Sequence, residues 1–165
     1  MKLGTKDYLE LMGITAVILS LLFVALEIRQ SNRIALSQSE TDLRSRVKEI
    51  QSRVIENDDI AAALVKMRSE DAQLTPEENE KIYSWALSLQ THWNGVAAAF
   101  ENGLVSQSTM DTVLETPTAV FSKYPGLKPY FRQISEEFNF RENPTNVWQA
   151  IFREIDSNNS STDTP

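Results

Sequence analysis

An uncharged apolar run near the amino end places the strongest constraint on what this chain can fold into. Residues 11–26 read LMGITAVILSLLFVAL, sixteen positions without a charged side chain. A helix that crosses a bilayer needs roughly 20 mostly apolar residues, and Tyr8 and Ile28 extend the run toward that length. We therefore predict a transmembrane helix over residues 8–28, after a short flank over residues 1–7. The side chains expected to face lipid are Leu11, Ile14, Val17, Ile18, Leu21, Leu22, Phe23 and Leu26.

Two other interpretations of this run compete with a membrane span. A signal peptide would have a basic start, which Lys2 and Lys6 supply, and a small-x-small cleavage site, for which residues 35–37 are a candidate. Arg29 and Arg33 separate that site from the apolar core, where a cleavage region is normally uncharged. A buried helix of a soluble protein is usually shorter or amphipathic. Both interpretations are weaker than anchoring.

Residues within and beside the span suggest its contacts. Gly13, Ala16 and Ser20 make one face of small side chains, which can let two such helices associate as a homo-oligomer. Arg29 and Arg33 follow the span directly, so we expect them at the membrane surface.

The distribution of cations sets the expected orientation. More Lys and Arg follow the span closely than precede it. Cytoplasmic flanks carry the excess of these cations, so the part of the chain after the span is expected to be cytoplasmic.

The span is predicted to continue as a stalk helix over residues 29–56. Neither Gly nor Pro occurs between Gly13 and Pro76, so no strong breaker interrupts the helix. The stalk is basic, since residues 29–53 carry a net charge of +3. A stripe at helical spacing must be covered by the distal helices or by a second copy, and folding back of the distal helices is the favoured alternative. The stripe consists of Leu43, Val47, Ile50 and Val54.

An acidic helical domain is predicted over residues 57–156, and a disordered tail over residues 157–165. Residues 54–165 carry a net charge of −9. No period-two run suggests a sheet, so the expected fold class is all-α, with about five helices after the stalk. Six segments are candidates for these helices, namely residues 60–69, 76–102, 107–114, 117–122, 126–137 and 145–155.

Capping signals and apolar stripes define these helices. Either Asp58 or Asp59 can cap the first of them, and Thr75-Pro76-Glu77-Glu78 predicts a capping box for the next. Phe138 is expected to face inward at the end of the helix over 126–137. The predicted core stripe of the long helix is Ile82, Trp85, Leu89, Trp93, Val96 and Phe100.

Three motifs resemble a group of small bacterial single-span membrane proteins of uncharacterised function. Residues 27–33, Glu-Ile-Arg-Gln-Ser-Asn-Arg, are similar to the (E/Q)IRQ(N/S)xR stretch that ends their spans. Residues 74–78 ahead of a Trp-containing helix, and Tyr124-Pro125-Gly126 before an aromatic helix, extend the resemblance. It implies a bacterial inner (plasma) membrane protein with one span and a helical C-terminal domain, and it brings no activity.

The sequence offers no catalytic constellation. Without cysteine there is no thiolate nucleophile or Cys-based metal site. His92, the only histidine, has no carboxylate three or four residues away, and we expect a boundary residue with one satisfied hydrogen bond. We predict no catalytic, metal or cofactor-binding residue and no enzyme. The formal charge of −7 argues against a nucleic-acid partner.

The favoured function is a membrane-anchored binding, scaffold or accessory protein whose partners are the bilayer and an unidentified protein. One alternative is a membrane-tethered enzyme or small-ligand sensor with a pocket near Trp85, His92 and Trp93. A solvent-open pocket holding a second ionisable group would favour that alternative, and a filled core would exclude it. The other alternative is a secreted helical domain released by signal cleavage.

Overall fold

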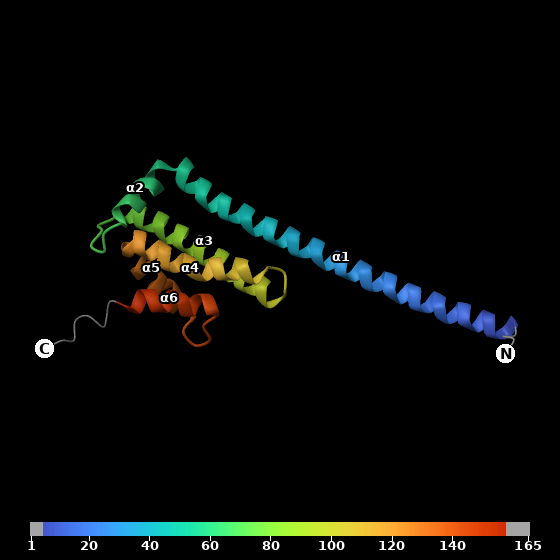
Figure 1. Cartoon of the computed structure of the whole chain (residues 1–165). Helices are drawn as coiled ribbons and strands as arrows, with labels where there is room; N and C mark the ends of the chain where they lie inside the picture. The colour runs from blue at the N-terminus through green and yellow to red at the C-terminus, as the bar shows by residue number, and fades with distance from the viewer. Residues whose placement is uncertain (1–4, 158–165) are drawn as a thin grey trace. The chain divides into compact units, whose positions relative to one another are not determined.

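The computed structural model describes residues 5–157, and all regular structure within that range is helical. Within these residues a long first helix is followed by five further α-helices, which confirms the predicted all-α fold class (Figure 1). The elements are α1 Thr5–Glu56, α2 Asp58–Lys66, α3 Pro76–Glu101, α4 Gln107–Lys123, the 3₁₀ turn η1 Pro125–Leu127, α5 Lys128–Glu137 and α6 Asn146–Asp156. The tail predicted to be disordered, residues 157–165, lies outside the described residues except for Ser157.

Helix α1 belongs to two units, and the boundary between them lies between Gln38 and Ser39. In the first unit, every residue from Tyr8 to Ile34 is exposed. This part of α1 is long and apolar enough to cross a membrane, with a mean hydropathy of 2.4 in its most apolar stretch. In the second unit, α1 joins the packing: Leu43 and Val54 lie against the hydrophobic core. The distal helices therefore fold back on the predicted stripe.

The start of α2 corrects a predicted cap. Asn57, rather than either aspartate after it, is the N-cap: its side-chain oxygen accepts hydrogen bonds from the backbone N–H groups of Asp59 (3.1 Å) and Ile60 (3.2 Å). Both aspartates then lie in the first turn, where negative charge is stabilised by the helix dipole.

Helix α3 begins with the predicted capping box. The Thr75 hydroxyl accepts a hydrogen bond from the Glu78 N–H at 3.2 Å, and the Glu78 carboxylate accepts one from the Thr75 N–H at 2.9 Å. Glu78 also accepts hydrogen bonds from the Lys66 ammonium at 2.6 and 2.8 Å, which ties α2 to α3. These contacts hold the pKa of Glu78 below its ordinary value, the bond from Lys66 having the largest effect.

Helix α4 is continuous where two helices were predicted. Pro117 lies inside it, although proline lacks the N–H that would complete the helical hydrogen-bond ladder. The buried side chains of Met110, Val113, Pro117 and Phe121 recur at helical spacing, so one face of α4 packs into the domain on both sides of the proline. Burial of this continuous face offsets the missing hydrogen bond, and the predicted break at residues 115–116 is wrong.

Aromatic side chains occupy the centre of the second unit. Trp93 stacks on Phe131 with ring centroids 5.5 Å apart, and Phe121 meets Phe131 edge-on at 5.0 Å. Phe138, predicted to face inward, is instead 52% exposed. It caps the end of α5, and the next residue, Asn139, adopts a positive φ of 55° that turns the chain out of the helix.

A close backbone contact at Gly126 joins the end of α2 to η1. The Gly126 N–H donates to the Met67 carbonyl at 3.0 Å. A Cβ atom at Gly126 would lie 2.5 Å from the Ser69 carbonyl oxygen, so only glycine fits. Because Pro125–Leu127 forms this 3₁₀ turn, α5 starts at Lys128, two residues later than predicted.

We expect Gly126→Ala to destabilise the helical domain by about 1–3 kcal/mol, because the added methyl group forces two backbone segments apart. All three tryptophans lie in this domain, so urea unfolding of the full chain followed by tryptophan fluorescence reports on it. Gly95→Ala is the matched control, since a Cβ there meets nothing within 4 Å inside α3. It should stabilise by about 0.5–1 kcal/mol. Equal effects of the two substitutions would contradict the packing at Gly126.

Candidate functional site

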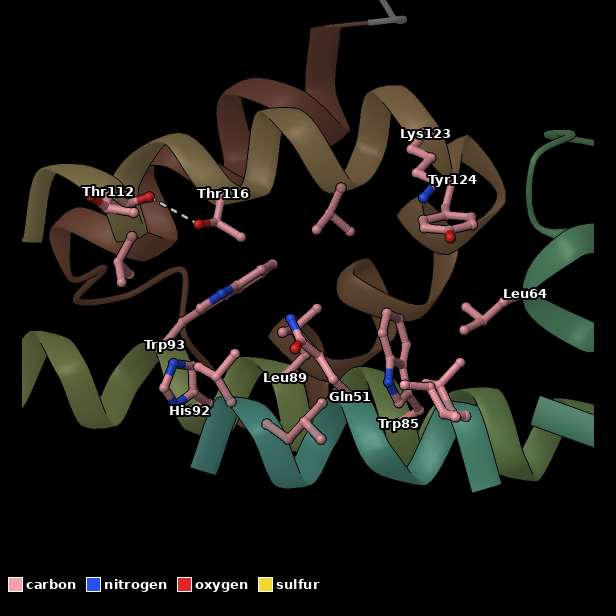
Figure 2. A pocket seen from close by; sticks show the side chains of 16 residues that line it. Gln51, Leu64, Trp85, Leu89, His92, Trp93, Thr112, Thr116, Lys123 and Tyr124 are labelled. Carbon is pink, nitrogen blue, oxygen red and sulfur yellow. Dashed lines mark hydrogen bonds between the residues drawn. The ribbon is translucent and has the colours of Figure 1, made fainter. Parts of the chain in front are cut away.

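A cavity of about 640 Å³ lies in the second unit between α1, α3 and α4 (Figure 2). Its volume is in the range of small-molecule sites, roughly 300–1,000 Å³. The walls are mainly aliphatic and aromatic, and a few polar groups face them. The lining residues are Val47, Ile50, Gln51, Val54, Ile55, Leu64, Trp85, Leu89, His92, Trp93, Thr112, Val113, Thr116, Val120, Lys123 and Tyr124.

The distal part of α1 forms one wall of the cavity. Val47, Ile50 and Val54 recur every three or four residues, so they share one helix face. Gln51 adds an amide to this apolar face, and Figure 2 shows its side chain extending from α1 toward the cavity. Of the stripe predicted from the sequence, Leu43 packs on the core, Val47 and Ile50 line the cavity, and Val54 does both.

A carboxylate holds this wall in place against α4. Oε1 of Glu40, on α1, accepts hydrogen bonds from the Ser106 N–H at 3.2 Å and from the Thr109 hydroxyl at 3.1 Å. Both donors belong to the start of α4, where Ser106 is the N-cap. These bonds lower the pKa of Glu40, the contacts with Ser106 having the largest effect. Glu40 thus fixes α1 to the amino end of the opposite wall.

Helix α3 supplies the aromatic wall. Trp85, Leu89 and Trp93 recur every four residues and all line the cavity. Trp93 is fully buried and rests on the core, whereas Trp85 and Leu89 are only partly buried because the cavity lies beside them. Trp85 Nε1 is buried and has no hydrogen-bond partner among the described residues.

His92 is the most unusual polar group of the cavity. It is 8% exposed, and Nδ1 is buried with no hydrogen-bond partner among the described residues. The predicted boundary residue with a satisfied bond is therefore wrong at this nitrogen. Burial lowers the pKa of His92, and the nearby Arg46 charge lowers it further, so the imidazole is neutral at pH 7. Buried polar atoms normally have a partner, so this nitrogen carries an unfavourable desolvation cost.

The polar groups lie at opposite ends of the cavity. In Figure 2, His92 and Thr112 are at one end, and Lys123 and Tyr124 are at the other. The Lys123 ammonium lies 5.2 Å from the centre of the Tyr124 ring. It makes no ion pair within the described part of the chain. The cavity therefore has a cationic end and a neutral polar end, with apolar walls between them.

Sequence reasoning identified part of this site and missed the rest. It placed Trp85, His92 and Trp93 together through their helical spacing. Lys123 and Tyr124 were missed because α4 was expected to break before them. The signal that could have found them is the spacing of Val113, Val120 and Lys123, which continues one helix face across Pro117.

The remaining predicted core positions are buried to different degrees. Ile82 and Val96 are fully buried, whereas Phe100 is partly buried against the core. No group of three metal-ligating side chains occurs within residues 5–157. The ionisable groups that line the cavity are His92, Lys123 and Tyr124, without a carboxylate to pair with them. This arrangement is suited to holding a molecule by apolar contact and a few polar contacts.

The predicted membrane residues all lie on the exposed part of α1. Gly13, Ala16 and Ser20 are exposed, and the Ser20 hydroxyl donates to the Ala16 carbonyl at 2.9 Å within the helix. Arg29 and Arg33 are exposed one turn apart. At least half of each predicted lipid-facing side chain is accessible, from 52% at Ile18 to 65% at Leu21.

Comparison with known proteins yields no relative. No protein-family model matches the chain, and no curated protein and no solved structure is similar to it.

We expect Glu40→Gln to weaken the contact between α1 and α4 and to lower the midpoint of thermal unfolding at pH 7. Because the folded state lowers the pKa of Glu40, its carboxylate stabilises the fold above the unfolded value of 4.5. That stabilisation is lost as the pH falls through the folded-state value. The substitution should therefore also reduce the loss of stability between about pH 6 and pH 3.

Thermal unfolding followed by tryptophan fluorescence at several pH values measures both effects. Glu115→Gln, which removes an exposed carboxylate from α4, is the control and should leave the midpoint unchanged. Part of the pH dependence should remain in the Glu40 variant, since the pKa values of Glu78 and Glu137 are also lowered. A midpoint and pH profile equal to those of the unsubstituted chain would refute the role of Glu40.

Proposed function

We propose that this chain is a single-pass membrane protein whose helical domain binds a small, largely apolar molecule without transforming it. The observation that carries this proposal is the cavity between α1, α3 and α4, whose mainly apolar walls include a few polar side chains. Concave, mostly apolar sites with a few convergent polar groups are the usual form of small-molecule sites.

The exposure of α1 supports anchoring. A helix with exposed Leu, Ile, Val and Phe on all sides is unfavourable in water, since each Å² of apolar surface costs about 25 cal/mol. A buried helix of a soluble protein would hide those side chains. The candidate cleavage site at residues 35–37 lies within α1, where the backbone is helical, whereas cleavage sites favour exposed loops. Both features favour a retained span over residues 8–28.

The flanking charges support a cytoplasmic helical domain. Arg29 and Arg33 are exposed directly after the span, where they can contact anionic headgroups. The resemblance of residues 27–33 to small bacterial membrane proteins favours the bacterial plasma membrane as the location.

Cysteine labelling in intact cells tests this orientation, because the chain has no cysteine of its own. We expect Ser122→Cys, at an exposed site of α4, to resist a membrane-impermeant thiol reagent until the cells are opened. Lys2→Cys, on the other side of the span, should be labelled in intact cells and serves as the control. Labelling of the Ser122 variant in intact cells would reverse the orientation, and recovery of the chain in the soluble fraction would exclude anchoring.

The exposed apolar side chains favour a small ligand over a protein scaffold. In residues 39–157, the large exposed hydrophobic residues come from four separate segments: α1, α2, the connection between α3 and α4, and the end of α5. Apolar residues exposed singly are normal on a protein surface and mark no interface. They are Ile55, Val65, Leu104 and Phe138. A protein partner or a second copy of the chain would be favoured instead if these residues proved to bind one another across copies.

The cavity also favours binding over catalysis. General acid–base chemistry needs a positioned proton donor or acceptor that another group orients. His92 Nδ1 has no such orienting partner in the described residues, and no carboxylate lines the cavity.

Filling the cavity should abolish binding of a neutral apolar probe. We expect 1-aminoanthracene to bind the full chain in lipid nanodiscs saturably, with energy transfer from Trp85 and Trp93. Val120→Trp, on the cavity wall, should weaken this binding by about tenfold or more, because the larger ring occupies the space. Ala119→Trp adds the same ring at the neighbouring exposed position and should bind as the unsubstituted chain does.

Two measurements keep this result interpretable. Circular dichroism verifies that both variants retain their helices, and Leu89→Phe gives a smaller change on the same cavity if the Val120 variant fails to fold. Binding that survives every filling substitution, or that equals the background of empty nanodiscs, would exclude the cavity as a ligand site.

A further inference from the structure

We propose that the ligand of this cavity is an anionic amphiphile with a single chain, namely a medium- or long-chain carboxylic acid whose acid group lies at Lys123. This inference rests on the proposed ligand-binding function and specifies the chemical class of the ligand. It is carried by the different character of the two ends of the cavity (Figure 2) and by the apolar walls between them.

The cationic end accounts for the acid group. Lys123 lines the cavity, and no described carboxylate neutralises its ammonium group. The Tyr124 hydroxyl lies at the same end and can donate a second hydrogen bond to an acid. An ammonium and a hydroxyl together form the kind of charge-assisted site that a carboxylate prefers.

The opposite end offers no anionic partner to a cationic ligand. His92 is neutral, and part of the cause is the positive charge of Arg46, whose field reaches the imidazole. A ligand cation would find no lining carboxylate at either end of the cavity.

The walls account for the alkyl chain of the ligand. Trp85, Leu89 and Val120 present apolar surface along the cavity, and an apolar chain gains about 0.8 kcal/mol for each CH₂ group that it buries. On α4, the lining residues Thr112 and Lys123 are eleven positions apart, which corresponds to about 16 Å along the helix axis. An elongated space of this volume fits one extended chain better than a two-chain phospholipid.

The charge of the whole domain makes Lys123 decisive. Residues 54–165 carry a net charge of −9, which repels an anion from most of the surface. A carboxylic acid can therefore bind well only where local cations reverse that field.

Bromine quenching of tryptophan fluorescence tests this proposal on the full chain in lipid nanodiscs. The probes are 12-bromododecanoate and 12-bromododecan-1-ol, which share a chain and differ in the head group. Their bromine atoms quench nearby indoles, and Trp85 and Trp93 line the cavity. We expect saturable quenching by both probes, with the acid binding about fivefold more tightly than the alcohol.

Substitutions of Lys123 separate the effect of its charge on binding from the effect of its shape. Lys123→Gln should weaken acid binding about fivefold and leave alcohol binding unchanged, whereas Lys123→Arg should keep the preference for the acid. Lys48→Gln is the matched control, because it removes the same charge from an exposed site of α1 outside the cavity, and it should change neither probe.

The possible failures point to different conclusions. Equal binding of acid and alcohol, unaffected by Lys123→Gln, would overturn the anionic class while leaving a ligand-binding cavity in place. The absence of saturable quenching by either probe, together with no binding of 1-aminoanthracene, would overturn the ligand-binding function itself.

Discussion

The hydrogen bonds of Glu40 are the interaction on which the cavity depends. They join α1 to the first turn of α4, two segments more than sixty residues apart in the chain. The capping box of α3 and the Lys66–Glu78 ion pair fix the third wall through α2. Each wall is therefore held at its end by polar contacts, while the middle of each helix presents apolar side chains to the space between them. This separation explains how a small helical domain keeps a hollow open beside a packed aromatic core.

Local signals in the sequence were sufficient to predict most of the helices. The errors arose where packing between segments distant in sequence determines the structure. Thr75, Pro76 and Glu78 form the predicted cap because every group in a capping box lies within four residues. The predicted helix break at Pro117 was wrong because the sequence shows only the local loss of a helical hydrogen bond. The burial that compensates for this loss comes from helices distant in sequence. The pattern of Trp85, His92 and Trp93 placed them on one face of α3. Whether that face was filled or hollow depended on α1 and α4, which no spacing within α3 can reveal.

The location of the cavity shows which charges of the chain can affect ligand binding. By net charge alone, the basic stalk should be attracted to anionic lipid headgroups. The acidic domain should be repelled by them. The cavity contradicts this simple division, since Lys123 belongs to the acidic domain and lies at one end of the cavity with no acidic neighbour paired to it. Net charge describes the long-range field, but the selectivity of a site depends on the few charges that line it.

His92 connects the stability of this domain to its proposed function. A buried nitrogen without a partner costs about 1–3 kcal/mol, and simple stability would favour an apolar residue at that position. Sequences that break a local rule of this kind tend to do so at functional sites. A ligand that binds only the folded domain stabilises it in proportion to the logarithm of ligand concentration, so occupancy of the adjoining cavity offsets this cost.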